Sequence, residues 1–279
     1  MMGMKMAKLN KMYENRICVI TGAASGIGRA LALALKARGA ILALSDVNAE
    51  GLAETLKLAG GVNSNTILID VLDVSDADAI MAYAPHVEKT LGKADYIFNV
   101  AGLTRVGNFD KTSLESMELV MNVNYWGVVR MCKAFLPQLK ATQGGIINIS
   151  SLFGLIGYPG QTHYCASKFA VRGFSETLAQ EVEAFGIRVS CVHPGGVATG
   201  ISRNAIVDAL PDNIESQDAL NKKFDAVAAT SALDAALVIL KGAAKGSRRI
   251  LIGRDAVFLS YVQRLFPSGY TKFLAKLMR

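Results

Sequence analysis

Cysteine, proline and charge are all scarce in this sequence, and each shortage excludes a class of protein. The four cysteines, Cys18, Cys132, Cys165 and Cys191, are far apart and form no C-x-x-C pair, which excludes a zinc knuckle and a thioredoxin-like motif. Their neighbours are apolar, so we expect four reduced core thiols. Six prolines are too few for a proline-rich linker. With 19% charged and 51% hydrophobic residues, the chain has too little charge for disorder and enough apolar material for a sizeable core.

Long hydrophobic runs are missing as well. Residues 141–167 lack Asp, Glu, Lys and Arg, but their six Gly and Pro residues are atypical of a membrane span. The start of the chain is polar and basic, and the apolar run at 17–20 is too short for a secretory signal. We therefore expect no transmembrane span, and a cytoplasmic location that suits reduced cysteines. Three scattered histidines give no ligand cluster, so no metal is expected.

Seven short apolar runs alternate with amphipathic segments. We expect strands at residues 17–20, 40–44, 66–71, 96–100, 146–150, 188–192 and 249–252. We expect helices at residues 27–38, 50–58, 77–91, 114–139, 164–185 and 231–244. The strands are continuous apolar runs, as in a parallel sheet that is buried on both faces. The pattern predicts an α/β fold over residues 1–279, a single domain with a Rossmann-type doubly wound parallel sheet of about seven strands.

Two segments depart from this alternation. Residues 197–230 are polar and follow the carboxyl end of a strand, where a substrate lid is expected. Residues 254–279 form a basic amphipathic C-terminal tail, interrupted by Pro267 and Gly269. We expect the tail to pack on a partner subunit or on the lid, and peripheral contact with anionic lipid is the alternative.

Positive charge is concentrated towards this tail. The net charge is +7, but residues 241–279 hold nine Lys or Arg and one acid, which makes +8 and leaves −1 for the other 240 residues. A nucleic-acid partner is not expected, because a binding domain would carry a basic surface of its own.

A glycine-rich turn, residues 21–28, joins the first expected strand to the first helix. Glycines there let the backbone approach a pyrophosphate, and the helix N-terminus supplies free N–H groups. The spacing is G-x-x-x-G-x-G, and an ordinary glycine-rich turn is the alternative, but the position at the first strand–helix junction favours a dinucleotide. The predicted contacts are Gly22, Ser25, Gly26, Ile27 and Gly28.

Asp46 lies at the end of the second expected strand, eighteen residues after Gly28. A carboxylate at this place can bind the adenosine ribose hydroxyls of NAD and would repel the 2′-phosphate of NADP. We therefore predict NAD as the cofactor. Arg29 and Arg38 are expected to be solvated on their helix, and a helix N-cap is the alternative role for Asp46.

Tyr164 and Lys168 are four residues apart near the start of an amphipathic helix, so phenol and ammonium share one face. Lowering the pKa of a tyrosine from about 10 to about 7 takes about 4 kcal/mol. One cation at about 4 Å supplies about 4 kcal/mol at an effective dielectric of about 20. Ser150 and Ser151 follow the fifth expected strand, where a hydroxyl can bond a substrate oxygen. His163 projects to a different face of the helix, and a structural role is expected for it.

Together these motifs resemble the short-chain dehydrogenase/reductase family, in its branch of roughly 250 residues. The resemblance runs from Arg16 to Gly253 and adds further motifs to those above. They are Asp73-Val74, Asn99-Val100-Ala101-Gly102 (the family has a second Asn where Val100 stands), Asn124-Tyr125-Trp126-Gly127, and Pro194-Gly195 with Val197 and Thr199. The family's catalytic serine lies thirteen residues before the tyrosine, which selects Ser151.

The resemblance implies a role for each of these residues. Tyr164 would be the acid/base, Ser151 would orient the substrate oxygen, and Lys168 would lower the phenol pKa and hold the nicotinamide ribose. Asn124 would support a proton-relay water. The nucleotide would contact Asp73, Val74, Asn99, Ala101, Gly102, Tyr164, Lys168, Pro194, Gly195, Val197 and Thr199, and the protein would be a homodimer or homotetramer.

The implied reaction is reversible hydride transfer between NAD(H) and a secondary alcohol or ketone. The tail makes a lipophilic substrate plausible (steroid-, retinoid- or lipid-like), with Phe153, Leu155, Ile156 and Tyr158 as candidate pocket residues. One alternative is an NADPH-dependent 3-oxoacyl-thioester reductase, against which Asp46 argues. Another is a non-catalytic NAD-binding regulatory protein, against which the retained Tyr164 and Lys168 argue.

Overall fold

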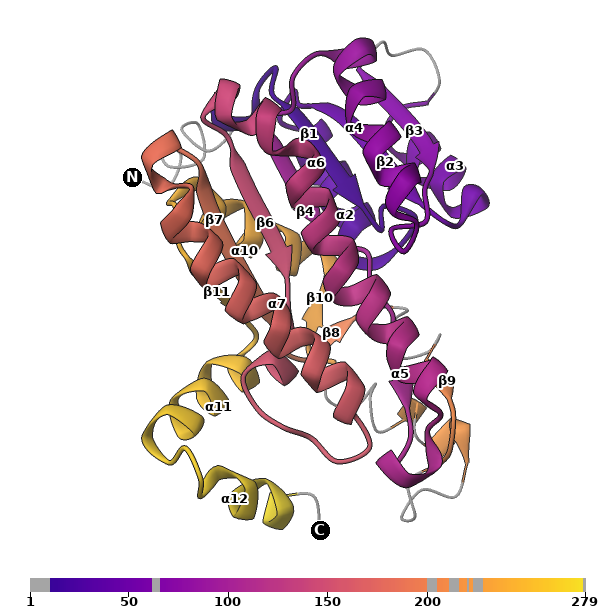
Figure 1. Ribbon diagram of the computed structural model, residues 1–279, viewed down its shortest axis with the longest axis vertical. Helices are drawn as coiled ribbons and strands as arrows, with labels where there is room; N and C mark the ends of the chain where they lie inside the picture. Colours follow the sequence, from indigo (N-terminus) through magenta and orange to yellow (C-terminus); the bar gives the residue numbers. More distant parts are fainter. Residues whose placement is uncertain are drawn as a thin grey trace.

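The computed structural model of the chain is built around a central sheet of seven strands (Figure 1). It describes residues 11–61, 66–199, 205–210, 216–219, 221–222 and 228–277. The strands are β1 (Ile17–Thr21), β2 (Ile41–Asp46), β3 (Ile67–Val71), β4 (Tyr96–Asn99), β6 (Gly145–Ile149), β7 (Arg188–Pro194) and β11 (Arg249–Ile252). They pair in parallel in the order β11-β7-β6-β4-β1-β2-β3. The predicted doubly wound sheet is therefore confirmed, and the strand order reverses direction beside β1, which is where such sheets bind ligands.

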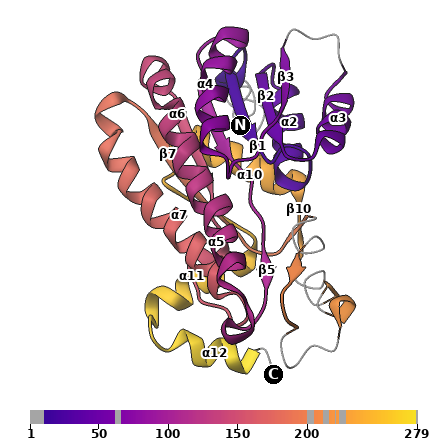
Figure 2. The ribbon, with the colours of Figure 1, turned by 45° about the vertical axis from the view of Figure 1, so that its right-hand side comes forward.

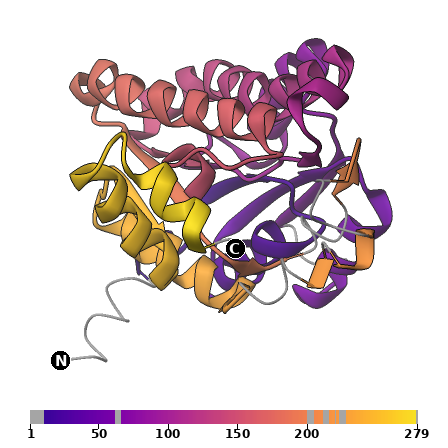
Figure 3. The same ribbon diagram turned by 90° about the horizontal axis from the view of Figure 1, so that it is seen from below.

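Helices cover both faces of the sheet (Figure 3). One layer contains α2 (Gly26–Lys36) and α10 (Ala232–Ala244), and the other contains α4 (Ala77–Leu91), α6 (Gly127–Thr142) and α7 (Thr162–Glu181). The helix α3 (Ala49–Leu58) follows β2. Because both faces are covered, the strands are mostly apolar.

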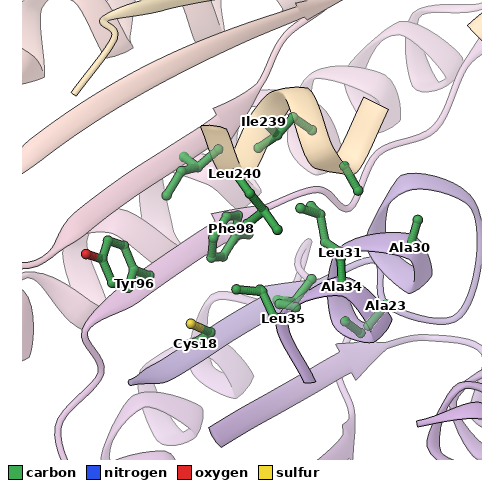
Figure 4. Close-up of a cluster of buried hydrophobic side chains, with 14 of the residues drawn as sticks. Cys18, Ala23, Ala30, Leu31, Ala34, Leu35, Tyr96, Phe98, Ile239 and Leu240 are labelled. Atoms are coloured by element: carbon green, nitrogen blue, oxygen red, sulfur yellow. The ribbon is translucent and has the colours of Figure 1, made fainter. Parts of the chain in front are cut away.

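Apolar side chains on α2 and α10 form the core on one face. Leu31 and Leu35 of α2 lie against Ile239 and Leu240 of α10 and against Phe98 of β4, and all five are fully buried (Figure 4). Burying one such side chain contributes about 1.5–3 kcal/mol. This packing fixes the N-terminal end of α2 at the carboxyl edge of the sheet.

The helix expected over residues 114–139 is in fact three pieces. An α-helix, α5 (Leu114–Met121), leads into a π-helical turn, η2 (Asn122–Trp126), and then into α6. The sequence pattern did not reveal this single π turn, and such turns are frequent at functional sites. It places Asn124 inside the protein, where it is fully buried.

The tail forms two helices, α11 (Arg254–Leu265) and α12 (Tyr270–Leu277), with the expected break at Pro267 and Gly269 between them. Both lie at the same end of the molecule as the start of α7 (Figure 2). The Tyr270 hydroxyl accepts a hydrogen bond of 3.0 Å from the Gly157 amide. Leu274 is buried in the cluster described next.

That cluster corrects two predictions. Leu155 and Ile156 were expected to line a substrate pocket, but they are buried with Leu152, Ala256 and Leu274. The described part of the tail packs on the segment after β6, which was not among the expected surfaces, and packing on a partner subunit or on the lid stays a prediction. The sequence does not distinguish a pocket wall from a contact with the tail, because apolar side chains are typical of both. Peripheral contact of the tail with anionic lipid also stays a prediction.

Only parts of the predicted lid are described. Residues 200–204, 211–215, 220 and 223–227 of the expected lid lie outside the described residues. In the rest, β8 (Val197–Ala198) pairs with β10 (Thr230–Ser231), and β9 (Ile206–Val207) pairs with β5 (Arg105–Val106). The first pairing joins the two ends of the predicted lid to each other, and the second joins the lid to the segment after β4.

Two further features of the described residues concern the state of the cysteines and the hydropathy of the helices. All four cysteines are buried free thiols, as predicted. Among the described helices, none combines the length and the apolar character that crossing a bilayer requires.

Candidate active site

A cavity of about 480 Å³ lies at the carboxyl edge of the sheet, on both sides of β1. Its walls come from the segments that follow β1, β2, β3, β4, β6 and β7 and from the start of α7. Its lining includes most of the predicted site, namely Gly22, Ser25, Gly26, Ile27, Gly28, Asp46, Asp73, Val74, Ala101, Gly102, Ser151, Tyr164, Lys168, Pro194, Gly195, Val197 and Thr199. Of the predicted residues, only Asn99 and Asn124 are outside this lining.

The glycine-rich turn has the shape that a phosphate cradle needs. Gly22 has φ +69°, and a Cβ added to it would lie 2.7 Å from the amide nitrogen of Ala101. A Cβ at Gly28 would lie 2.0 Å from the carbonyl oxygen of Gly22. Any larger residue would fill this space, and the first N–H groups of α2 have no partner inside the helix. The turn therefore fits a dinucleotide pyrophosphate.

Arg29 holds this turn from behind. Its guanidinium donates to the Ala24 carbonyl at 2.5 Å, to the Thr55 hydroxyl at 3.0 Å and to Glu54 at 2.6 Å. The prediction that Arg29 is solvated is therefore wrong, because buried acceptors from the turn and from α3 attract it. Arg29 is not among the residues that line the cavity.

Asp46 faces the same turn from the end of β2. One carboxylate oxygen accepts from the Ala24 amide and the other from the Asn48 amide, both at 3.0 Å. The N-cap of α3 is Asn48, which accepts from the Gly51 amide, so the alternative role for Asp46 does not apply. Asp73, at the same end of the cavity, accepts from the Ser75 amide.

The reacting end of the cavity is formed by three side chains from β6 and α7. Lys168 Nζ lies 5.6 Å from the Tyr164 ring centroid and donates to the Ile149 carbonyl at 3.1 Å. The Ser151 hydroxyl is hydrogen-bonded to Tyr164 and accepts from the Phe153 amide at 3.1 Å. Tyr164 and Lys168 are both buried. One helical turn thus brings phenol and ammonium to the same side, as their spacing predicts.

The electrostatics of this group differ from the expectation. Burial raises the pKa of Tyr164 to about 12, while its hydrogen bond with Ser151 acts in the opposite direction. Burial lowers the pKa of Lys168 to about 8. The prediction that Lys168 alone lowers the pKa of Tyr164 to about 7 is therefore wrong. The expectation counted the attraction between the two charges but omitted the hydration that each loses on burial.

Ser150 differs from Ser151 in what its hydroxyl does. The Ser150 hydroxyl donates to the Lys168 carbonyl at 2.8 Å, inside the protein. Ser150 thereby holds the start of α7 against β6, while Ser151 contacts the phenol. The geometry favours Ser151 as the residue that meets a substrate.

The two asparagines support the cavity from behind. Asn124 accepts from the Leu103 amide at 2.9 Å and donates to the Leu103 carbonyl and the Ser167 hydroxyl at 2.9 and 3.0 Å. Its amide hydrogens are therefore both used. Asn99 donates to Asn148 at 2.8 Å. This bond gives Asn99 a structural role, and its contact with the nucleotide stays a prediction.

The histidines near the site are not bases. His163 Nε2 donates to the Arg105 carbonyl at 2.9 Å, and burial lowers the pKa of this imidazole. His193 Nδ1 donates to the Ser151 carbonyl at 3.0 Å, and burial lowers its pKa to about 4. Both rings are bound to backbone, which agrees with the structural role expected for His163.

Sequence reasoning missed the apolar wall of the cavity. Leu103, Leu119 and Val123 line it together with Thr104, whose hydroxyl donates to Gln161 at 3.1 Å. A loop and a helix bring these residues together, and no motif marks them. Phe153 and Tyr158, which were expected here, stack on each other with centroids 4.8 Å apart, and neither belongs to the cavity lining.

Comparisons with known proteins agree with this geometry. The family model described as short chain dehydrogenase matches residues 16–209. A Mycobacterium tuberculosis protein that carries the name of an oxidoreductase, SadH, is 44% identical over 267 residues, which is 94% of this chain and 95% of that protein. The 3-oxoacyl-[acyl-carrier-protein] reductase FabG of Thermotoga maritima is 38% identical over 189 residues, 67% of this chain and 76% of FabG. A solved short chain dehydrogenase/reductase from Burkholderia phymatum, in complex with NAD, has a TM-score of 0.81 at 27% identity, over 91% of this chain and 94% of that one.

Proposed function

Because the chain belongs to the short-chain dehydrogenase family of oxidoreductases, we propose that it interconverts a secondary alcohol and a ketone with a nicotinamide nucleotide. One observation carries the proposal: the Tyr164, Lys168 and Ser151 side chains share one cavity with the glycine-rich turn. When bound, the nucleotide supplies a hydride donor or acceptor and, when oxidised, a positive charge.

Tyr164 is the proton carrier in this proposal. Since burial holds its pKa at about 12, the phenol keeps its proton at neutral pH. A carbonyl oxygen that gains electron density during reduction is a stronger base than a phenolate, so it takes this proton. The Ser151 hydroxyl, bonded to the phenol, holds the same oxygen in reach of the proton. In alcohol oxidation the proton passes the other way, from the alcohol to Tyr164.

Lys168 has two tasks. With a pKa of about 8 it is mostly charged at neutral pH, and its charge favours the phenolate that forms during alcohol oxidation. Its ammonium has three donors, of which one is used by the Ile149 carbonyl. The others would hold the hydroxyls of the nicotinamide ribose. Asn124 supports a water in the proton path only through its oxygen, because its amide hydrogens are used.

We propose NAD rather than NADP as the cofactor. Asp46 and Asp73 line the end of the cavity beside the glycine-rich turn. Among the described lining residues, Lys168 at the opposite end is the single cation. Arg29, the nearest candidate to neutralise a 2′-phosphate, donates to Ala24, Thr55 and Glu54 instead. A phosphate about 4 Å from Asp46 would meet a repulsion of about 4 kcal/mol at an effective dielectric of about 20.

The substrate proposed is lipophilic. Beyond the reacting groups, the cavity wall is formed by Leu103, Leu119 and Val123. Such a wall favours an apolar alcohol or ketone with one polar oxygen directed to Tyr164. We propose, as the resemblance implies, that the protein works as a homodimer or homotetramer, and that the cytoplasm is its location.

A second candidate is an NADPH-dependent 3-oxoacyl-thioester reductase. The similarity to the Thermotoga maritima reductase FabG favours it, and the acidic nucleotide end of the cavity argues against it. A non-catalytic nucleotide-binding protein is less well supported, because Tyr164, Lys168 and Ser151 are all in place.

The test is a panel of secondary alcohols, ketones and a 3-oxoacyl thioester, assayed by nicotinamide absorbance with NAD(H) and with NADP(H). We expect turnover of apolar alcohols or ketones with NAD(H). Preference for the thioester with NADPH would support the second candidate. Nucleotide binding without turnover of any compound would support the non-catalytic alternative.

A further inference from the structure

Asp255 connects the C-terminal tail to the active site. It lies in the first turn of α11, outside every motif discussed above. Its carboxylate oxygen Oδ2 accepts a hydrogen bond of 2.7 Å from the Gly196 amide. Gly196 stands between the cavity-lining residues Gly195 and Val197. The single acid of the basic tail is thus directed at the backbone of the segment 194–199.

Glycines leave the room that this carboxylate occupies. A Cβ added to Gly195 would lie 2.2 Å from Asp255 Oδ2, and a Cβ added to Gly253 would lie 2.3 Å from Oδ1. Gly253 also has φ +92°, a conformation that other residues rarely adopt. The carboxylate therefore fills a space that two glycines keep open. A longer or bulkier side chain could not enter it without moving the segment.

Backbone bonds between described residues also support this segment. The Gly195 amide donates to the Ile252 carbonyl at 2.8 Å, and the Thr230 amide donates to the Gly196 carbonyl at 3.1 Å. Further along, Thr199 lies against Gly26 of the glycine-rich turn, at 3.2 Å from a Cβ placed there. Asp255 is the charged group in this set, and a hydrogen bond to a charged acceptor is stronger than one between neutral groups.

We propose that Asp255 is a positioning residue for nucleotide binding, which fixes the segment 194–199 in the conformation that receives the nicotinamide half of the cofactor. This inference rests on the proposed function, and it assigns a task to the tail. The adenosine half would bind to the glycine-rich turn and Asp46, which Asp255 does not touch. Loss of its carboxylate therefore weakens the complete dinucleotide selectively.

The experiment is calorimetric titration of the purified protein with NAD and, separately, with ADP, which lacks the nicotinamide half. For Asp255→Ala we expect NAD to bind about tenfold more weakly, the loss expected for one charge-assisted hydrogen bond. ADP should bind as it does to the wild type. Asp255→Asn should recover part of the loss, because its amide oxygen can still accept from Gly196. Asp78→Asn, a change in the exposed first turn of α4, is the matched control and should change neither affinity.

Equal weakening of NAD and ADP by Asp255→Ala, or unchanged NAD binding, would overturn the role of Asp255. A wild-type protein that binds no dinucleotide at all would instead overturn the proposed function, and the role of Asp255 with it.

Discussion

Replacing Lys168 by methionine tests how the lysine acts on Tyr164. Methionine is similar in length and apolar, so it removes the charge with little change in packing. The ammonium nitrogen lies 5.6 Å from the phenol ring centroid. At an effective dielectric of about 20, a unit charge at this distance favours a phenolate by about 3 kcal/mol. That energy corresponds to a rise of about two units in the pKa of Tyr164 when the charge is lost.

The effect should appear in the pH dependence of alcohol oxidation, in which Tyr164 must accept a proton. Because Tyr164 has a pKa of about 12 and Lys168 a pKa of about 8, we expect kcat/KM, measured by nicotinamide absorbance, to rise with pH in both proteins and to be lower in Lys168→Met below about pH 8, where the wild type carries the charge. At neutral pH the rate should therefore fall about a hundredfold. The rate of ketone reduction should fall less in Lys168→Met, since this reaction starts from the protonated phenol of Tyr164.

Lys140→Met is the control for this measurement. Lys140 also lies over an aromatic ring, 3.8 Å from the centroid of Phe185, but on α6 and away from the cavity lining. Its replacement should leave the profile unchanged. If the Lys168→Met profile coincides with that of the wild type, the charge of Lys168 does not stabilise the phenolate and the electrostatic reasoning is wrong.

Three further predictions follow from the same geometry. Lys168→Met should raise the free energy of unfolding at pH 7 by about 1–3 kcal/mol in urea titrations, because burial lowers the pKa of Lys168 to about 8. The cost of this buried charge is fully present below about pH 8 and is relieved as the pH rises to the unfolded value of 10.5, so a gain that does not shrink above pH 8 would contradict it. Asp46→Asn should shift the ratio of NAD to NADP affinity about tenfold to a hundredfold towards NADP, and an unchanged ratio would remove Asp46 from cofactor selection. Arg105→Met, which breaks a largely buried ion pair with Asp208 beside β9, should raise the KM of the organic substrate about tenfold and leave the nucleotide affinity unchanged. A tenfold loss of nucleotide affinity as well would show that the Arg105–Asp208 pair does not affect substrate binding alone.

The sheet and the glycine-rich turn could be predicted because their physical causes are local. Strands of a parallel sheet that is covered on both faces are mostly apolar, and short apolar runs mark all seven strands in the sequence. The turn at Gly22 needs a positive φ and no side chain, which glycine alone provides easily. The spacing of Tyr164 and Lys168 similarly follows from helix geometry.

Other features depend on what the chain brings together in space. The π turn at Asn124 and the two-residue strands around the lid leave no clear trace in hydrophobic periodicity. The pKa of Tyr164 depends on burial, which spacing does not reveal. Asp255 was missed because its partner, Gly196, is 59 residues away along the chain. Leu155 and Ile156 were assigned to the wrong surface, since their apolar character suits a pocket wall and a helix contact equally well.

Replacing Tyr164 by phenylalanine tests the central claim most directly, because it removes one hydroxyl group and keeps the ring that packs beside Phe153. The measurement pairs NAD affinity by calorimetric titration with turnover of the best substrate from the panel. We predict unchanged NAD affinity and a loss in turnover of about a thousandfold or more, as expected when the proton carrier is removed. Turnover at the wild-type rate, with NAD bound normally, would show that another group moves the proton.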